Sequence, residues 1–231
     1  MPRAACWPSG PLKAVLNAPE AMGAGQLEEA RVAARQAEIL GRPPRIAPLP
    51  LGQCPPEAAA MNVEIDVAAG HEPEEGRVSE WMATLIRHPV LARAHTRLAL
   101  VLMAGGTLPA RDRELVVLRT GWLAQAPFEW SGHVCLGKNL AGLTSEEIDR
   151  VTHGSAAPGW SAHDAAVLRA VEELARNAVI ADETWAVLAA SYNEQQLIEL
   201  PVLAGHYRGL AFLQNSLRTP ISELFTGLTD R

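Results

Sequence analysis

Apolar residues recur at helical spacing along most of this chain. One run covers Glu80–Ile86, and a second begins after His88-Pro89 and stops at Gly105-Gly106. A third is expected from Arg111 to about Ala124, where leucine and tryptophan residues share one helical face. Alternating β-branched runs, which are typical of strands, are scarce. The pattern predicts an all-α fold with short connections that favour antiparallel neighbours.

The later helices have recognisable start and stop signals. After Ala126-Pro127 a helix is expected to run to Gly142, because glycine readily adopts the left-handed conformation that ends many helices. Thr144 and Glu147 have the spacing of a capping box. Pro201 predicts a bend or a break in the last long helix. Capping residues mark three further helix starts near Ser161, Asp182 and Asn193.

The first forty-odd residues differ from the rest of the chain. They begin rich in proline and glycine, continue as a helical stretch from about Gly25 to Leu40, and end at Gly41-Arg-Pro43-Pro44. We therefore expect an N-terminal arm over residues 1–44 and a helical domain over residues 45–231. The arm is either a poorly ordered extension or a helix that docks on a partner subunit.

Composition narrows the class of protein. The chain has 231 residues, 48% of them hydrophobic, so it can bury a sizeable core. The formal net charge of −6 and the scattered basic residues argue against nucleic acid as a partner. No apolar run has membrane-spanning length, and the N-terminal residues do not resemble a secretory signal. Three widely spaced cysteines, Cys6, Cys54 and Cys135, fit reduced thiols in a cytoplasmic protein.

Candidate chemistry lies on the two central helices. Glu129 and His133 are four residues apart, so on a helix they share one face, one turn apart. Glu114 comes from the preceding helix. A carboxylate beside an imidazole is a proton-handling pair, because each group shifts the pKa of the other. Two readings without a catalytic role are also possible. Glu129 and His133 could be a solvated pair on the surface of a helix, and Glu114 could pair with Arg111 or Arg113.

Three motifs resemble the carboxymuconolactone decarboxylase family, part of a superfamily with the alkylhydroperoxidase D-like proteins. They are Leu-Pro-x-Arg-x-Arg-Glu-Leu at 108–115, Phe-Glu-Trp-x-x-His at 128–133 and Ala-Gly-Leu-Thr-x-Glu-Glu-Ile at 141–148. The resemblance covers roughly residues 45–220. It implies an all-helical subunit that assembles into a homo-oligomer, a trimer or a hexamer, with a site lined by the two central helices.

The peroxidase branch of that superfamily uses a Cys-x-x-Cys pair with a glutamate and a histidine. On this sequence the glutamate falls on Glu114 and the histidine on His133, but the cysteines fall on Ala126 and Glu129. Reduction of a peroxide by that route needs a thiolate and a resolving thiol. Cys135 is expected on nearly the opposite side of the helix from His133. The resemblance therefore favours the decarboxylase-like branch.

That branch implies a cofactor-free lyase or isomerase that acts on a carboxylated lactone or a related enolisable acid, in the catabolism of aromatic compounds. The lactone supplies its own electron sink, so neither a metal nor an organic cofactor is expected. His133 would donate and accept the proton, Glu129 would raise its basicity and orient it, and Glu114 would be the second carboxylate.

Substrate binding is assigned to four neighbouring residues. Arg111 or Arg113 would hold the carboxylate of the substrate through a bidentate contact. Phe128 and Trp130 would form an apolar wall. The remaining histidines have no spacing typical of a metal site.

Two other classes of protein stay open. One is an alkylhydroperoxidase-like oxidoreductase that lacks the Cys-x-x-Cys pair. The other is a non-catalytic oligomeric binding protein, which a closed site without a path to solvent would favour. In each case the extensive apolar faces predict a homo-oligomer.

Overall fold

Residues 23–231 are described by the computed structural model, and within that range they form helices and no strand. The expected all-α class is therefore confirmed. The first helices are α2 (Ala24–Ile39), the short 3-10 turn η1 (Leu51–Gln53), α3 (Pro56–Ala68), α4 (Glu80–Leu85) and α5 (Pro89–Met103). They are followed by α6 (Ala110–Leu123), α7 (Pro127–Ala141), α8 (Ser145–His153), α9 (Ala162–Asn177), α10 (Asp182–Ala189) and α11 (Glu194–Leu217).

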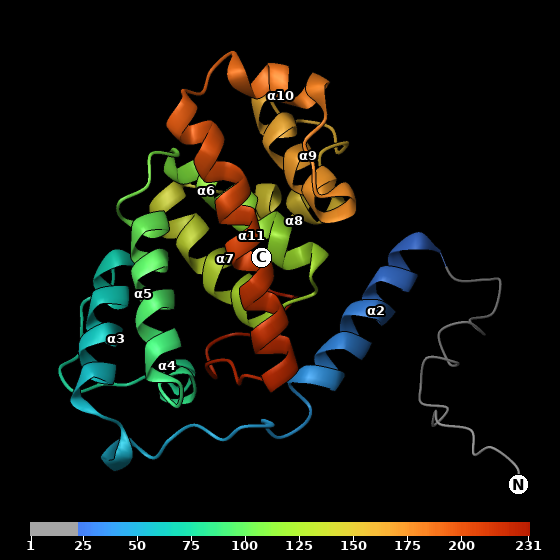
Figure 1. Ribbon diagram of the computed structural model, residues 1–231. Coiled ribbons are helices and arrows are strands. Elements are labelled where there is room, and N and C mark those ends of the chain that lie inside the picture. The colour runs from blue at the N-terminus through green and yellow to red at the C-terminus, as the bar shows by residue number, and fades with distance from the viewer. Residues whose placement is uncertain (1–22) are drawn as a thin grey trace, which may run out of the picture.

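Helix α6 lies at the centre of the fold. Helices α7, α9 and α11 pack against it, and the residues from Glu114 to Trp122 are all buried. Figure 1 shows α6 and α7 crossing behind α11 in the middle of the molecule. A helix that is buried all round is usually apolar all round, but α6 also carries Asp112, Glu114 and Arg119. Each of these charged groups needs a partner inside the protein.

Helices α3, α4 and α5 form a second, smaller core. Figure 1 shows them gathered on one side of the molecule. Leu213 of α11 packs against this group, so the long C-terminal helix joins the two cores. The buried members are Ala58, Met61, Met82, Leu85, Ile86 and Ala92.

Helix α2 packs against its own chain. Val32 belongs to the main core, and Ile39 is buried. Arg35 Nε donates to the Gln125 carbonyl at 3.2 Å, and the Leu228 amide donates to Gln36 Oε1 at 2.5 Å. The helical part of the expected arm thus has contacts within the subunit. Its first 22 residues, which include Cys6, lie outside the described residues.

The structure has helix ends at the positions expected from the glycine at 142 and the capping box at 144–147. Gly142 ends α7 in the left-handed conformation, with φ of 66° and ψ of 23°. Thr144 accepts a hydrogen bond from the Glu147 amide, and Glu147 accepts one from the Thr144 amide, so the capping box is confirmed. The last helix does not break at Pro201, since α11 is continuous from Glu194 to Leu217. Packing of its buried residues against α6 outweighs the loss of one helical hydrogen bond.

Two further expectations concern thiols and membranes. Cys54 and Cys135 are free cysteines in the described part of the chain. Among residues 23–231 no helix combines the length and the apolar character needed to cross a membrane.

Gly132 inside α7 and Gly142 at its C-terminal cap should respond in opposite ways to alanine. Gly142→Ala forces a side chain into the left-handed region, so we expect it to lower the free energy of unfolding by about 1 kcal/mol. Gly132→Ala adds a methyl group where no atom lies within 4 Å of the new carbon. It should raise the free energy of unfolding by about 0.4–1 kcal/mol. Urea titration of both variants beside the parent measures the two signs, and equal signs would contradict this view of the helix end.

Candidate functional site

A hydrogen bond between a carboxylate and an imidazole joins the two central helices. His133 Nδ1 on α7 lies 2.7 Å from Glu114 Oε2 on α6, and both side chains are buried. Glu114 and His133 are 19 residues apart, so the packing of α6 against α7 sets this contact. The sequence expected Glu129 to orient His133, but Glu114 forms that hydrogen bond. The ring nitrogen Nε2 is left facing the second carboxyl group.

Glu129 completes a row of carboxyl, imidazole and carboxyl groups. Its Oε2 lies 3.7 Å from His133 Nε2, one helical turn away on α7, and its side chain is 7% exposed. Gln214 of α11 also interacts with the Glu129 carboxyl group. Helix α6 passes close to the start of α7 at Gly121, where an added Cβ would lie 3.7 Å from the Trp130 nitrogen and 3.8 Å from the Glu129 Cβ, at ordinary contact distances.

The two carboxyl groups have pKa values that are shifted in opposite directions. Burial by itself would raise the pKa of Glu114, but His133 and Arg113 outweigh burial and lower it. Burial raises the pKa of Glu129, and the nearby imidazole offsets this only in part. For His133, burial would lower the pKa, but Glu114 and Glu129 together raise it. The shifts favour an ionised Glu114 beside a protonated His133, and they favour the neutral form of Glu129 more than in an exposed glutamate.

Tyr207 covers the imidazole from the last helix. Its ring meets that of His133 edge to face, with centroids 4.8 Å apart. Burial raises the pKa of the Tyr207 phenol well above its ordinary value, and the two glutamates raise it further. The phenol therefore stays a hydrogen-bond donor at the site. Helical spacing in the sequence does not give the rotation of α11 that turns Tyr207 toward α7.

Arg113 and Arg111 point to different places, although they are two residues apart. Arg113 Nε donates to Glu114 Oε1 at 3.1 Å, and its Nη1 donates to the Met103 carbonyl at 3.0 Å. Arg111 instead donates to Glu147 Oε1 at 2.5 Å and to Asp164 Oδ2 at 3.2 Å. The structure thus brings Arg113 to the candidate site and holds Arg111 in a separate ion-pair cluster.

The two expected wall residues also differ in place. Trp130 is fully buried against Trp122, with ring centroids 4.9 Å apart, and its Nε1 donates to the Asp230 carbonyl at 3.0 Å. It is a core residue that fixes α7 to the C-terminal segment. Phe128 is partly exposed and lies 6.1 Å from the ring of Trp81 on α4.

A chain of rings that sequence reasoning missed leads away from His133. His95 of α5 stacks on His206 of α11 with centroids 5.0 Å apart, and His206 meets the ring of Tyr207 edge to face. Burial and the neighbouring His95 lower the pKa of His206 to about 4. These histidines are over a hundred residues apart in sequence, so only the packing of α5 beside α11 brings them together.

The candidate site is closed in the isolated subunit. Glu114, Glu129 and His133 are each less than 10% exposed. Two cavities of the described chain are lined by other residues, from α6, α9 and α11 and from the segment after α8. Among residues 23–231 no group of three or more histidine, cysteine or acidic side chains is arranged to hold a metal ion.

Solved structures with similar folds include proteins of the alkylhydroperoxidase type. An uncharacterised peroxidase-related protein from Ralstonia eutropha with an alkylhydroperoxidase AhpD core shares 16% identity, covering 80% of this chain and 95% of its own, with a TM-score of 0.65. The debrominase Bmp8 shares 14% identity, covering 78% and 92%, with a TM-score of 0.64. At these identities the likeness shows the fold alone.

A third solved structure is a protein of unknown function from Agrobacterium tumefaciens, described as a putative antioxidant defence protein AhpD. It shares 19% identity over 59% of this chain and 93% of its own, with a TM-score of 0.53. None of the curated proteins compared with this chain matches it.

The sequence model of one family matches the part of the chain that holds the site. That model covers residues 89–173, which include α6 and α7 with Glu114, Glu129 and His133. The resemblance expected from the three motifs is therefore confirmed over this segment, because residues 89–173 match the model of the carboxymuconolactone decarboxylase family.

Proposed function

We propose that Glu114, His133 and Glu129 transfer protons on a small carboxylated lactone or a related enolisable acid, as a lyase or isomerase without a cofactor. The observation that carries this proposal is one imidazole held between two buried carboxyl groups with opposite pKa shifts. Neighbouring titratable groups whose pKa values are driven apart are suited to separate acid and base roles. The family match over the same residues supports this choice.

Decarboxylation of such a substrate needs one proton donor and no redox step. The carbon–carbon bond to the carboxylate breaks, CO2 leaves, and the bonding electrons move into the conjugated lactone carbonyl. The resulting dienolate takes a proton at carbon from His133 Nε2 or from the Glu129 carboxyl group. The donor then recovers its proton from water. The Tyr207 phenol is a further donor that would stabilise the negative charge on the dienolate oxygen.

Arg113 is the cation best placed to hold the substrate carboxylate. Both acidic partners of Arg111 are already engaged with it, whereas Arg113 borders Glu114 at the site. Its Nη2 has no hydrogen-bond partner among residues 23–231. A guanidinium group there would also lower the pKa of Glu114 and keep it ionised beside His133.

The residues of the site give less support to the alternative function, an alkylhydroperoxidase-like oxidoreductase. Ala126 and Glu129 occupy the positions where the peroxidase branch carries its two cysteines, and Ala126 is fully buried at the start of α7. Cys135 lies further along α7, where its sulfur accepts a hydrogen bond from Asn139. Peroxide consumption by the purified protein would nevertheless favour this reading over the lyase.

A second candidate function is a non-catalytic binding protein that keeps the helical framework. The specific observation that favours it is the closed site, since Glu114, Glu129 and His133 are each less than 10% exposed and line neither of the two cavities described above. Catalysis by the proposed site requires an opening between α5, α7 and α11, or one completed by a neighbouring subunit. Turnover measurements separate the two functions.

We also propose that the subunit forms a homo-oligomer through the outer faces of α5 and α11. These helices are neighbours through the stacked His95 and His206. Exposed apolar side chains are seven and three residues apart on α5 and four and ten residues apart on α11, so on each helix they share one face. Such a patch on a protein surface marks an interaction site. The side chains are Leu91, Leu98 and Val101 on α5, and Ile198, Val202 and Phe212 on α11.

Replacing His133 tests the lyase proposal. We expect His133→Gln to lower kcat on 4-carboxymuconolactone by about 10²- to 10⁴-fold, the usual contribution of a general acid–base group. Loss of the lactone absorbance together with CO2 release measures turnover. His163→Gln is the matched control, because His163 pairs with the Asp112 carboxylate at 2.9 Å outside the site. A folded His133→Gln protein with full activity would contradict the assignment.

The ion pair predicts a window of pH in which it stabilises the fold. Because the pKa of Glu114 is lowered, this group stabilises the fold above about pH 4.5, and the stabilisation is lost as the pH falls. Because the pKa of His133 is raised, this group stabilises the fold below about pH 6.5, and the stabilisation is lost as the pH rises. A double-mutant cycle with Glu114→Gln and His133→Gln, followed by urea unfolding at several pH values, should give the largest coupling inside that window. A coupling free energy that does not change with pH would exclude the charged pair.

The proposed seam on α5 and α11 predicts that the oligomer dissociates when a charge is placed in it. Phe212 is 60% exposed in the subunit. Phe212→Glu should weaken self-association by roughly tenfold or more, because an interface anchor is then replaced by a charge that loses its water. Light scattering at micromolar concentration measures the mass, and Leu224→Glu changes an exposed leucine outside the two helices as the control. A monomeric mass for the parent protein would refute the oligomer.

A further inference from the structure

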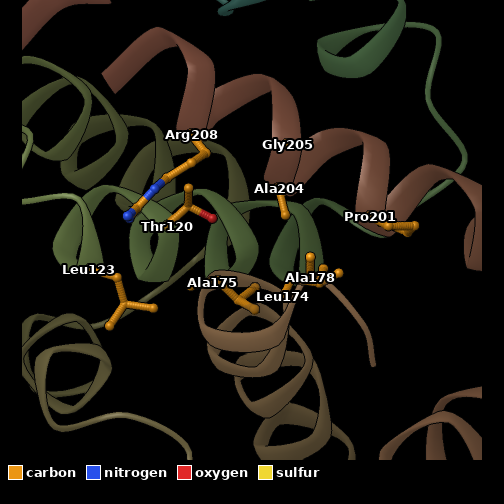
Figure 2. A pocket seen from close by; sticks show the side chains of 10 residues that line it. Thr120, Leu123, Leu174, Ala175, Ala178, Pro201, Ala204, Gly205 and Arg208 are labelled. Atoms are coloured by element: carbon orange, nitrogen blue, oxygen red, sulfur yellow. The ribbon is translucent and has the colours of Figure 1, made fainter. Parts of the chain in front are cut away.

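A cavity separate from the glutamate–histidine site opens between α6, α9 and α11. Its volume is about 220 Å³, and its lining is almost entirely apolar. Figure 2 shows Leu174 and Ala175 of α9, with Ala178 just after that helix, facing Ala204 and Pro201 of α11, and Leu123 and Arg208 toward one end.

A second, more open cavity of about 350 Å³ adjoins the first. The two share Leu123, Ala175 and Arg208 in their linings, so Arg208 lies where they meet. The second cavity is mostly polar, with Arg119 and Arg176 among its lining residues. The combined shape is an apolar chamber that continues into a basic mouth.

The positive charge at this mouth is only partly neutralised. Arg119 is committed to Glu172, with 2.9 Å between Nη2 and Oε1, and to two carbonyl groups at the end of α8. Glu172 also accepts hydrogen bonds from Ser155. Arg176 and Arg208 have no carboxylate within 4 Å among residues 23–231. Arg208 instead lies over the ring of Phe212, 5.2 Å from its centroid.

These features define the chemistry of a ligand. A cavity of about 150 Å³ holds benzene, and pockets for drug-sized molecules begin near about 300 Å³. A chamber between these sizes fits one aromatic ring or a medium-length alkyl chain. A guanidinium group at the mouth matches a carboxylate through two parallel hydrogen bonds.

We propose that this cavity binds a small monocarboxylate, with its ring or alkyl chain between α9 and α11 and its carboxylate on Arg208. Arg176 adds a second positive charge at the mouth. The site is distinct from the proposed catalytic site, because Arg208 and Tyr207 are adjacent on α11 and face different sides of that helix. It does not depend on the proposed lyase activity.

Calorimetric titration of the full chain with benzoate and octanoate tests the proposal, with benzyl alcohol and octanol as uncharged probes. We expect saturable binding of at least one carboxylate. Arg208→Met should weaken that binding about 10- to 100-fold while leaving the alcohols unaffected, because a charge-assisted contact is lost. Arg169→Met is the control, since Arg169 is an exposed arginine of α9 that lines neither cavity.

A second pair of variants tests the apolar chamber. Ala175→Phe places a ring where the two cavities meet and should abolish binding, while Ala186→Phe makes the same change at an exposed alanine of α10 and should leave it intact. Thermal unfolding and light scattering check that all variants keep their fold and mass. Absence of saturable binding up to millimolar concentration overturns the proposal.

Two further outcomes would also overturn it. Binding that is insensitive to Arg208→Met and Ala175→Phe but lost in His133→Gln would assign the carboxylate to the glutamate–histidine site. A smaller assembly in Ala175→Phe without any carboxylate binding by the parent would show that a second copy of the chain fills the chamber. Failure of the lyase assay with intact benzoate or octanoate binding would leave this proposal standing.

Discussion

Burial of the charged groups on α6 is the constraint on which the rest of this structure depends. The helix lies at the centre of the fold, so its carboxylates and its buried guanidinium cannot be hydrated and must be paired within the protein. Asp112 accepts hydrogen bonds from Tyr192 and His163, Glu114 from Arg113 and His133, and Arg119 donates to Glu172. Losing one partner of such a buried pair typically costs about 3–5 kcal/mol, so each pair strongly favours this one arrangement of the surrounding helices.

The partners of α6 lie in different directions, which gives each pair a separate structural role. His133 ties α6 to α7, and Glu172 ties it to α9. Tyr192 comes from the turn between α10 and α11. An apolar helix could slide or rotate against its neighbours at small cost, whereas these directional contacts fix both its rotation and its axial position. The position of the candidate site is therefore a consequence of the same polar contacts that order the fold.

Local features of this fold could be predicted from sequence, and the pairing of side chains between helices could not. The cap at Thr144 and the glycine at Gly142 depend on a few neighbouring residues, so the sequence was sufficient for both. Glu129 and His133 share a helix, so their proximity also followed from spacing. The bond between Glu114 and His133 depends on the rotation of two helices about their axes. Arg111 and Arg113 show the same limit, since a rotation of about 200° between them sends one into an ion-pair cluster and the other to the site.

The glutamate at position 129, where the peroxidase branch has a cysteine, is the main reason to propose proton transfer at this site. The peroxidase branch needs a thiol at that position because peroxide reduction requires a group that can give up electrons. A carboxyl group cannot do so, but burial raises the pKa of Glu129 and favours a form that carries a proton. Glu114 and His133 fall on the positions of the glutamate and histidine that the resemblance to that branch implies, and they form an ion pair here. An acid in place of a thiol at this position is suited to proton transfer and not to electron transfer, and this supports the lyase proposal over an oxidoreductase.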